Sequence, residues 1–268
     1  MSALDDVLTD LAAESDQLDG WVSGLRDHDW ATVTTPEGWT VAHQVAHLHW
    51  TDAASITAIE GGAGFDRLMS TAASDPTGFV DTEAERLART PPAELLTAWR
   101  QGRLDLADAL RGVPAGDKIA WFGPPMSATS MATARFMETW AHAHDVADAL
   151  GIDVPRTDRV RHVCHLGVRT RGFAHAVRGL EAPAVEVRVE LTSPTGDTWT
   201  WGPDDVADRV TGDGWDFALL ATRRRHRDDV DVRATGGAAD AWLDIAQTFA
   251  GAPGADPVRL ADREERGR

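Results

Sequence analysis

A carboxylate and two imidazoles lie close together in the segment RFMETWAHAHD, residues 135–145. Glu138 and His142 are four positions apart, so on a helix their side chains lie one above the other on the same face. His144 is two positions further on, about 200° around the helix axis, and cannot share that face. Asp145 returns to the side of His142, where its carboxylate can accept a hydrogen bond from a ring N–H. This spacing is typical either of an exposed polar face or of a metal site.

A second histidine cluster, in the segment GWTVAHQVAHLHW (residues 38–50), offers the third ligand that a metal site needs. His47 follows the apolar positions of this segment toward the core, and we predict that it is the ligand. His43, one turn earlier, is the reserve candidate, and His49 is expected to face away. Two histidines and one carboxylate with an open position form the ligand set of a catalytic zinc site, or sometimes of a nickel or iron site. The sequence therefore predicts a divalent metal held by His47, Glu138 and His142.

Four amphipathic helices are predicted to position these residues. Apolar residues recur at intervals of three and four, which is the helical period. The expected helices are 3–28, 41–60, 81–110 with an interruption at 90–92, and 128–150, with a turn at GGAG (61–64) and a loop at 111–127. Four such helices in about 150 residues are typical of a helix bundle.

Beyond residue 183 the apolar period changes from nearly four to two, which indicates strands. A fifth helix is expected before this change, at 157–180. The expected strands are 184–194, 198–202, 215–222 and 229–236, followed by a helix at 238–251 and a frayed tail at 261–268. The fold class is therefore α+β, with a metal-binding bundle at 1–152, a linker helix at 153–182 and a small α+β domain at 183–262.

The chain is acidic, with 43 Asp and Glu against 26 Lys and Arg and a formal net charge of −17. A protein that neutralises nucleic-acid phosphates needs a basic face, so we expect no nucleic-acid partner and no binding to anionic membranes. No run of 18 apolar residues is present, and the acidic N-terminus is unlike a signal peptide. The single cysteine, Cys164, excludes an intramolecular disulfide. We expect a soluble, cytoplasmic protein, either a monomer or a homodimer.

Taken together, PEGWTVAHQVAHL and, some ninety residues later, ETWAHAHDVADAL resemble the DinB-like four-helix metalloproteins. The resemblance is greatest to the branch of mycothiol-dependent maleylpyruvate isomerase, which has Trp-Thr-Val before a ligand histidine and then Glu-x-x-x-His-x-x-Asp. The matching positions here are Trp39, Thr40 and Val41 before His47, and Glu138, His142 and Asp145. The resemblance implies an up-down-down-up bundle and a small α+β domain similar to sterol-carrier proteins. It also implies a metal-dependent isomerase or S-transferase that acts on a small electrophilic substrate, with mycothiol as the thiol cosubstrate.

The chain departs from this branch in its C-terminal part. The isomerases use an arginine near a Gly-Arg ending, whereas this sequence has TFAGAP at the comparable place, residues 248–253. Arg224, in the segment TRRRHRDD, and Arg233 are the candidates to replace it, and with Asp145 they complete the candidate catalytic residues. The alternative interpretation of TRRRHRDD is a solvated loop that pairs with its own acids.

Two other functions fit the same residues. A metal site can assist hydrolysis or a lyase reaction without any thiol, because a bound ion also activates water. The chain can also be a non-catalytic protein that binds a metal and a small ligand. Cys164 is expected to be a buried apolar residue rather than a nucleophile.

Overall fold

The computed structural model describes residues 2–262. Contacts divide the chain into two compact units that meet at Val154 and Pro155. The first unit contains helices without a named strand, and the second contains a four-stranded sheet with helices. The predicted α+β class, a helical bundle followed by a smaller α+β part, is therefore confirmed.

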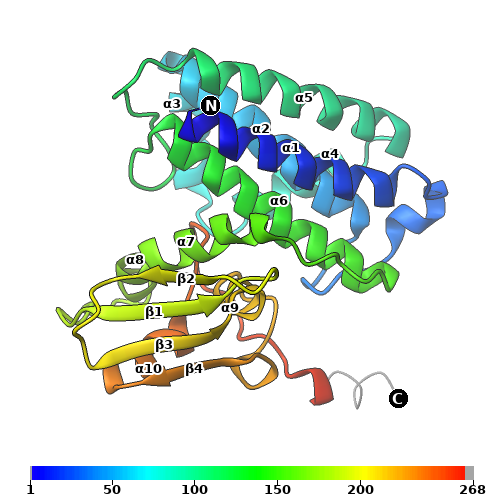
Figure 1. The fold of residues 1–268 in the computed structure, drawn as a ribbon. Helices are drawn as coiled ribbons and strands as arrows, with labels where there is room; N and C mark the ends of the chain where they lie inside the picture. Colours follow the sequence, from blue (N-terminus) through cyan, green and yellow to red (C-terminus); the bar gives the residue numbers. More distant parts are fainter. Residues whose placement is uncertain (1, 263–268) are drawn as a thin grey trace. The chain divides into compact units, whose positions relative to one another are not determined.

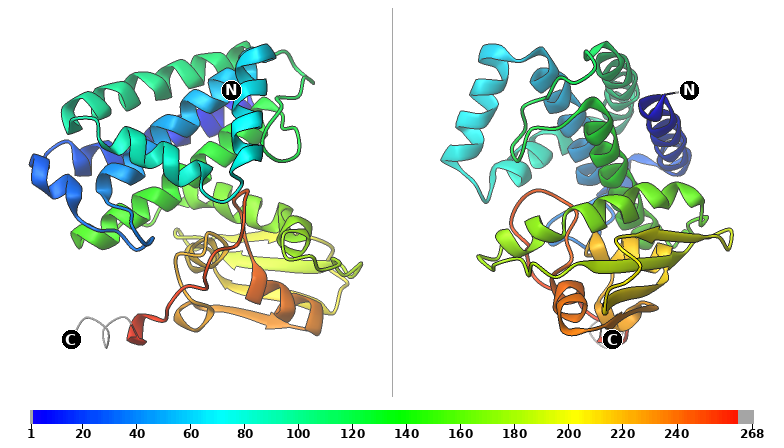
Figure 2. Two further views of the ribbon diagram at one scale, coloured as in Figure 1. Left: turned by 180° about the vertical axis from the view of Figure 1, so that it is seen from behind. Right: turned by 60° about the vertical axis from the view of Figure 1, so that its left-hand side comes forward.

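Four long helices form the bundle of the first unit (Figure 1). They are α1 (Ala3–Val22), α2 (Val41–Glu60), α5 (Pro92–Gly112) and α6 (Ala128–Leu150). Helix α1 packs against α6, and α2 packs against both α5 and α6. Two short helices, α3 (Gly62–Ser74) and α4 (Phe79–Ala88), contact α2 and lie at one side of the bundle (Figure 2).

Most of the predicted helix ends in this unit are confirmed. The bounds of α2 and α6 are those expected, and Gly151 ends α6 in the left-handed conformation that favours glycine. The interruption expected at 90–92 separates α4 from α5. Pro91 is the N-cap of α5 and Pro92 is its first residue, where the fixed φ of proline suits the start of a helix. Helix α1 is shorter than predicted, because a 3₁₀ turn, η1 (Asp27–Ala31), follows it.

The prediction of a turn at GGAG was wrong in part, because α3 begins at Gly62. Gly61 ends α2 with a φ of 69°, and the chain then starts a new helix at once. Phe65 is the buried residue of α3, and it stacks on Trp121 from the loop before α6. This helix is stabilised by a tertiary contact to a distant loop, and such a contact cannot be predicted from the local pattern of apolar residues.

Apolar side chains of the long helices meet in one buried core. It lies where α1, α2, α5 and α6 face each other, and each large side chain buried there contributes about 1.5–3 kcal/mol. The members include Leu18, Val22, Val41, Val45, Leu48, Leu95, Trp99 and Val146. This core holds α2 against α6, the two helices that carry the predicted metal ligands.

The second unit is built on a mixed sheet with the strand order β2-β1-β3-β4. The strands are β1 (Val187–Thr192), β2 (Thr198–Trp201), β3 (Asp208–Asp213) and β4 (Val232–Thr235). Strands β1 and β3 are parallel, and the two outer pairs are antiparallel. The other elements are η2 (Asp158–Val160), α7 (Arg161–Arg169), α8 (Arg171–Ala176), α9 (Gly214–Ala221), η3 (Arg227–Asp229) and α10 (Gly237–Ile245). Helix α9 packs on α7 and on the sheet, and α10 packs on β3 and β4.

Several parts of the prediction for this unit were wrong. The strand expected at 215–222 is helix α9, because the Asp213 side chain accepts from the Asp216 N–H and starts a helix. Strand β3, which occupies the centre of the sheet, was not predicted. Its Gly212 has a φ of 147°, and a side chain there would meet the Asp231 carbonyl. The helix expected at 157–180 is present as η2, α7 and α8, which are separate short helices.

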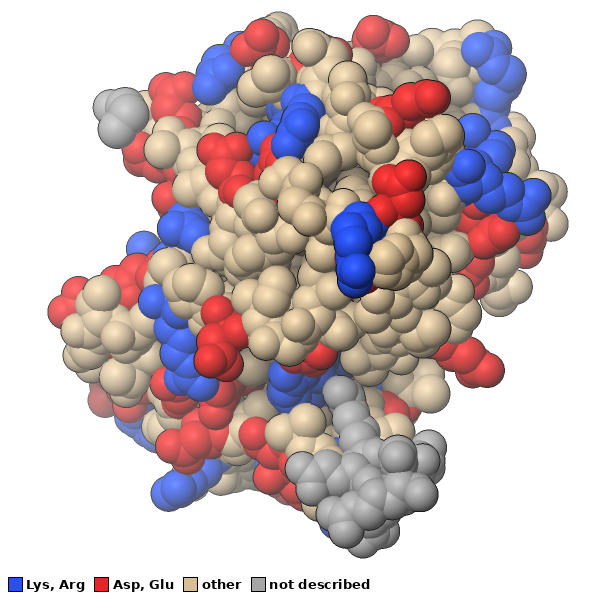
Figure 3. Space-filling model, turned by 90° about the vertical axis from the view of Figure 1, so that its right-hand side faces the viewer, with Lys and Arg blue, Asp and Glu red and all other residues tan. Residues whose placement is uncertain are grey.

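Charged side chains of both signs are interspersed on the face drawn in Figure 3. Among the described residues, no helix is both long and apolar enough to cross a membrane. The frayed tail expected at 261–268 lies mostly outside the described residues.

Candidate metal centre

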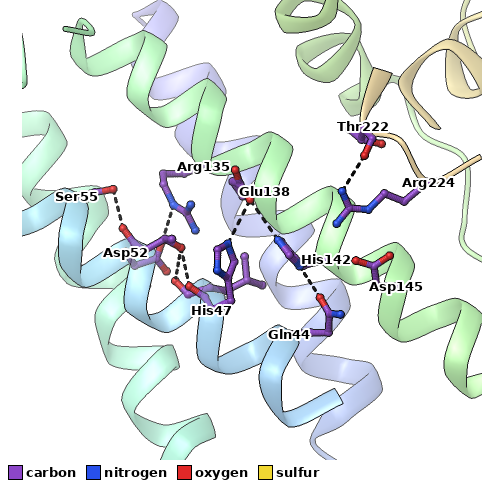
Figure 4. Close-up of polar contacts among 12 residues, drawn as sticks. Gln44, His47, Asp52, Ser55, Arg135, Glu138, His142, Asp145, Thr222 and Arg224 are labelled. Atoms are coloured by element: carbon purple, nitrogen blue, oxygen red, sulfur yellow. Dashed lines mark hydrogen bonds and ion pairs between the residues drawn. The ribbon is translucent and has the colours of Figure 1, made fainter. Parts of the chain in front are cut away.

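Helices α2 and α6 run antiparallel and meet along a row of mostly polar side chains, nearly all of them buried, which we call the polar seam (Figure 4). Because the helices are antiparallel, residues with higher numbers on α2 contact residues with lower numbers on α6. The pairs are Gln44 with His142, His47 with Glu138, Asp52 with Arg135, and Ser55 with Met131. Burying a polar group lowers the stability of the fold unless the group is hydrogen-bonded, so a row of them inside a bundle requires an explanation.

The centre of the polar seam brings the three predicted ligands together. One ligand atom each from His47, Glu138 and His142 lies within 4.8 Å of the other two. Glu138 Oε2 is 3.4 Å from His47 Nε2 and 3.2 Å from His142 Nε2. The two imidazole rings are tilted by 44°, with their centroids 4.4 Å apart. Among the His, Cys, Asp and Glu side chains of residues 2–262, these three form the cluster whose ligand atoms lie close enough together to hold an ion.

Glu138 is held in its charged form. Burial alone would raise the pKa of its carboxyl group, but the hydrogen bonds from His142 and His47, with their charges, outweigh burial and keep this pKa well below its ordinary value. The site therefore offers a carboxylate, the form in which an acidic residue binds a metal.

Gln44 determines which nitrogen of His142 can bind an ion. The Gln44 Nε2 donates to Thr34 Oγ1 at 2.7 Å, and Thr34 Oγ1 donates to the Trp39 carbonyl at 3.0 Å. The Gln44 Oε1 therefore faces Nδ1 of His142, which it contacts closely. Since an amide oxygen only accepts, we assign the proton of His142 to Nδ1. Nε2 faces the Glu138 carboxylate and carries there either the proton of the hydrogen bond between them or, in its place, an ion.

Trp39 covers the ring faces of both histidines. Its indole ring is 5.4 Å from the His47 ring and 5.8 Å from the His142 ring, between centroids. Its Nε1 donates to Asp81 on α4 at 3.0 Å. The loop before α2 and the helix after α3 thus cooperate in placing an apolar wall over the ligands.

These residues fit a divalent ion. A carboxylate and two imidazole nitrogens are the donors that zinc, nickel and iron accept. His142 Nε2 points at a carboxylate, an arrangement that is favourable only when a cation or a proton lies between the two atoms. His47 Nδ1 is also buried without a hydrogen-bond partner in the described part of the chain. An ion bound at Nε2 would leave the proton of His47 on this nitrogen.

The other histidines of the two clusters lie elsewhere. His43, the reserve candidate, accepts from the Thr40 N–H at 3.2 Å through Nδ1 and contacts Glu85 at 2.7 Å through Nε2. His49 faces α5, where its ring lies against Gly102. His144 is buried against Trp140, with 3.9 Å between ring centroids. The helical rotation inferred from the sequence accounts for the placement of His49 and His144, whereas His43 is kept from the site by its contacts with Thr40 and Glu85.

Asp145 and Gln44 flank the same nitrogen of His142. Asp145 is buried, and its Oδ2 is 3.7 Å from His142 Nδ1. Sequence reasoning missed the closer contact from Gln44. The signal was available, because Gln44 is a polar residue three positions before His47, between the apolar Val41 and Val45.

Arg224 and Arg233, the other candidate catalytic residues, belong to the second unit. Arg224 follows α9 and donates to the Thr222 carbonyl at 2.8 Å. Arg233 lies on β4, is exposed, and pairs with Asp231 at 3.2 Å. A catalytic role for either residue stays a prediction.

The basic segment that contains Arg224 pairs largely with acids of its own unit. Arg223 contacts Asp256 at 2.7 Å, and Arg227 contacts Asp240 and Asp244, each at 2.5 Å. These contacts favour the interpretation of this segment as a loop that pairs with its own acids.

Comparisons with known proteins agree with this fold. The family model described as mycothiol maleylpyruvate isomerase N-terminal domain matches residues 11–147, just over half of the 268 residues. A second model, described as wyosine base formation, matches residues 183–235, which contain the four strands. Two proteins of Mycobacterium tuberculosis, uncharacterized protein Rv0036c and uncharacterized protein MT0041, are each 56% identical over 247 residues. Each alignment covers 92% of this chain and 96% of the relative.

Two solved structures share the fold. They are the mycothiol-dependent maleylpyruvate isomerase and a histidine-to-alanine mutant of it, each with a TM-score of 0.60 and 16% identity. The alignment covers 86% of this chain and 92% of each of those chains. A helical bundle followed by a smaller α+β unit is thus the architecture of a known class of DinB-like proteins. The chain belongs to the mycothiol maleylpyruvate isomerase N-terminal domain family.

Proposed function

We propose that this protein is a metal-dependent enzyme that uses a thiol, mycothiol in the first instance, either to isomerise a small electrophilic substrate or to transfer the thiol sulfur to it. The observation that carries the proposal is the convergence of His47, Glu138 and His142 from two helices to within 4.8 Å. Family membership supports the thiol, because the related solved structures are those of a mycothiol-dependent enzyme.

Each residue around the proposed site has a defined task. Glu138 supplies a negative charge and, with His47 and His142, would hold the ion, for which zinc is the first choice and nickel or iron the alternatives. Gln44 keeps the proton of His142 on Nδ1. Trp39 shields the rings from water and forms an apolar wall. When bound, the ion supplies Lewis acidity and lowers the pKa of a coordinated thiol.

The chemistry needs no further cofactor. In an isomerisation, the thiol sulfur adds to a conjugated double bond, the resulting single bond rotates, and elimination returns the thiol. In an S-transfer, the sulfur displaces a leaving group and remains on the product. Asp145, Arg224 and Arg233 are the candidates for proton transfer and for binding a charged group of the substrate.

Metal analysis of protein purified without a histidine tag tests the metal site. We expect about one zinc, nickel or iron ion per chain, and a loss of most of it in His142→Ala and Glu138→Gln. His43→Gln is the matched control, because both nitrogens of His43 contact other partners. A parental protein that stays free of metal after incubation with zinc or nickel would contradict the proposal.

Turnover with and without a thiol separates the proposal from its rivals. Maleylpyruvate and other conjugated electrophiles are the first substrates to try, and we expect their conversion to require mycothiol. Turnover that is indifferent to mycothiol and other small thiols would favour a metal-assisted hydrolase or lyase. A coordination shell closed by four protein ligands would favour a non-catalytic binding protein.

A further inference from the structure

The polar seam contains one charged pair that the metal site does not explain. Arg135 Nε donates to Asp52 Oδ1 at 2.9 Å, and both side chains are buried, with 2% and 7% of their surface exposed. Arg135 is three residues before Glu138 on α6, so the two side chains leave neighbouring positions on one face. Figure 4 shows the pair beside His47, and the Asp52 carboxylate is close enough for its charge to interact with that imidazole.

Stability alone does not account for this pair. A buried ion pair often stabilises a protein no more than two apolar residues of the same volume, because both charges lose their hydration. In this pair the lost hydration is compensated especially poorly. Burial raises the pKa of Asp52 in spite of Arg135, and the Arg135 Nη2 has no hydrogen-bond partner in the described part of the chain. The pair therefore serves a purpose other than net stability.

Its position suggests that purpose. An apolar interface between two helices tolerates sliding and rotation, because many packings bury similar area. Two buried opposite charges match in a single alignment, since a shift of one turn, about 5.4 Å, would leave both unpaired. The next pair along the seam, Ser55 with Met131, makes only a weak contact at 3.7 Å and supplies no such constraint.

We propose that the buried Asp52–Arg135 ion pair is a positioning device that sets the register of α2 against α6, so that His47 meets Glu138 and His142. This inference rests on the proposed function in that the geometry it protects is the metal centre. Asp52 and Arg135 are positioning residues and touch neither the ion nor the substrate.

Three variants and one control test the proposal. Asp52→Leu/Arg135→Met replaces the pair by apolar side chains, Asp52→Asn removes one charge with little change of shape, and Arg135→Lys keeps both charges. Ser55→Ala, at the neighbouring step of the seam, is the control. Cobalt(II) is the metal probe, because its visible absorption reports the coordination geometry as well as the affinity.

A second readout needs no metal. Spin labels replace the exposed residues Glu60 and Asp148 in a Cys164→Ala background, and the distance between them is measured by pulsed electron paramagnetic resonance. These positions are on the order of 30 Å apart along the antiparallel helices, so the distance reports their register.

We expect the apolar double variant to unfold at or above the parental temperature, yet to bind cobalt at least about tenfold more weakly, with altered absorption. Its label distances should broaden or shift. Asp52→Asn should show the same two losses, whereas Arg135→Lys and Ser55→Ala should retain the parental distance and bind cobalt within about threefold of the parent.

Parental cobalt affinity and parental distances in the apolar double variant would overturn the proposal. If that variant does not fold, parental values in Asp52→Asn would overturn it equally. If the parental protein binds no cobalt, the proposed function fails, but the label distances still decide whether the pair sets the register.

Discussion

The indole ring of Trp39 lies nearly parallel to the imidazole ring of His142, with 18° between the planes and 5.8 Å between the centroids. The indole is fixed from the other side by the hydrogen bond from its Nε1 to Asp81. A residue of the loop before α2 is thus clamped between a predicted ligand and helix α4. The clamp limits both the rotation of the His142 ring and the access of water to it.

Trp39→Ala should therefore weaken metal binding by about tenfold, the lower end of the effect of outer residues around a metal. Asp81→Leu should show part of this loss, because it frees the indole, whereas Asp81→Asn retains an acceptor oxygen and should behave like the parent. Competition for zinc against a chromogenic chelator measures all three. A Trp39→Ala protein with parental zinc affinity would show that the stacking is incidental.

The proton of His142 gives a second prediction. In the metal-free protein, we expect nitrogen NMR to find the proton on Nδ1, because Gln44 Oε1 accepts there. Gln44→Leu removes the acceptor, so the ring should populate both tautomers and the metal affinity should fall about 10- to 100-fold. Thr34→Val removes only the partner that orients the Gln44 amide, so its metal affinity should lie between those of the parent and Gln44→Leu. A parental His142 ring without a proton on Nδ1 would refute the assignment.

The contact between α1 and α5 predicts a pH dependence of stability. The hydrogen bond from Arg100 lowers the pKa of Asp19, burial opposes this shift, and the charges of Arg100 and Arg103 add to it. A lowered pKa in the folded state stabilises the protein above the ordinary value of 3.8, and the contribution is lost as the pH falls through the folded-state pKa.

Asp19→Asn should accordingly lose about 0.5–1 kcal/mol of unfolding free energy at pH 7, since Arg100 is partly exposed and solvent screens the pair. The difference from the parent should vanish in strong acid. Urea unfolding at pH 7 and near pH 2 measures it. The control is Asp105→Asn, because the exposed Asp105 carboxylate accepts only from Gln101 in the described part of the chain. An Asp19→Asn deficit that persists unchanged in acid would mean that packing, and not charge, is responsible.

Cys164 should be inert in the folded protein. It is fully buried, burial raises the pKa of its thiol, and its Sγ donates to the Gly214 carbonyl at 3.0 Å. A thiol reagent should react more than about a hundredfold faster in denaturant than in buffer, because only the exposed thiolate is nucleophilic. Rapid reaction of the native protein would place this cysteine among the functional candidates again.

Sequence patterns predicted the bundle well because its long helices show both a clear apolar period and clear signals at their ends. The period of apolar residues marks α2 and α6, and Gly151 marks where α6 ends. The spacing of Glu138 and His142 placed both on one face without further information, and His47 followed from the apolar side of α2. Helical geometry alone carries these inferences, so no knowledge of the tertiary structure was needed.

The remaining features depend on contacts between distant segments. A short apolar run such as 215–222 is compatible with a strand or a helix, and the Asp213 cap decides for the helix. Strand β3 has a single fully buried residue, Val210, and exists because β1 and β4 pair with its two edges. The contact of Gln44 with His142 joins residues 98 positions apart. No local period encodes these relationships.

His47 and Glu138 are 91 positions apart along the chain, and they meet in the interior of the bundle. An ion shared between them would tie a loop that contains α3, α4 and α5, much as a crosslink does. Closing a loop of that size in the unfolded chain is worth about 4–5 kcal/mol by the entropy model for disulfides. The metal ion of the proposed site would then also act as a crosslink, and a cell starved of that metal would lose folded protein to its proteases as well as the proposed activity.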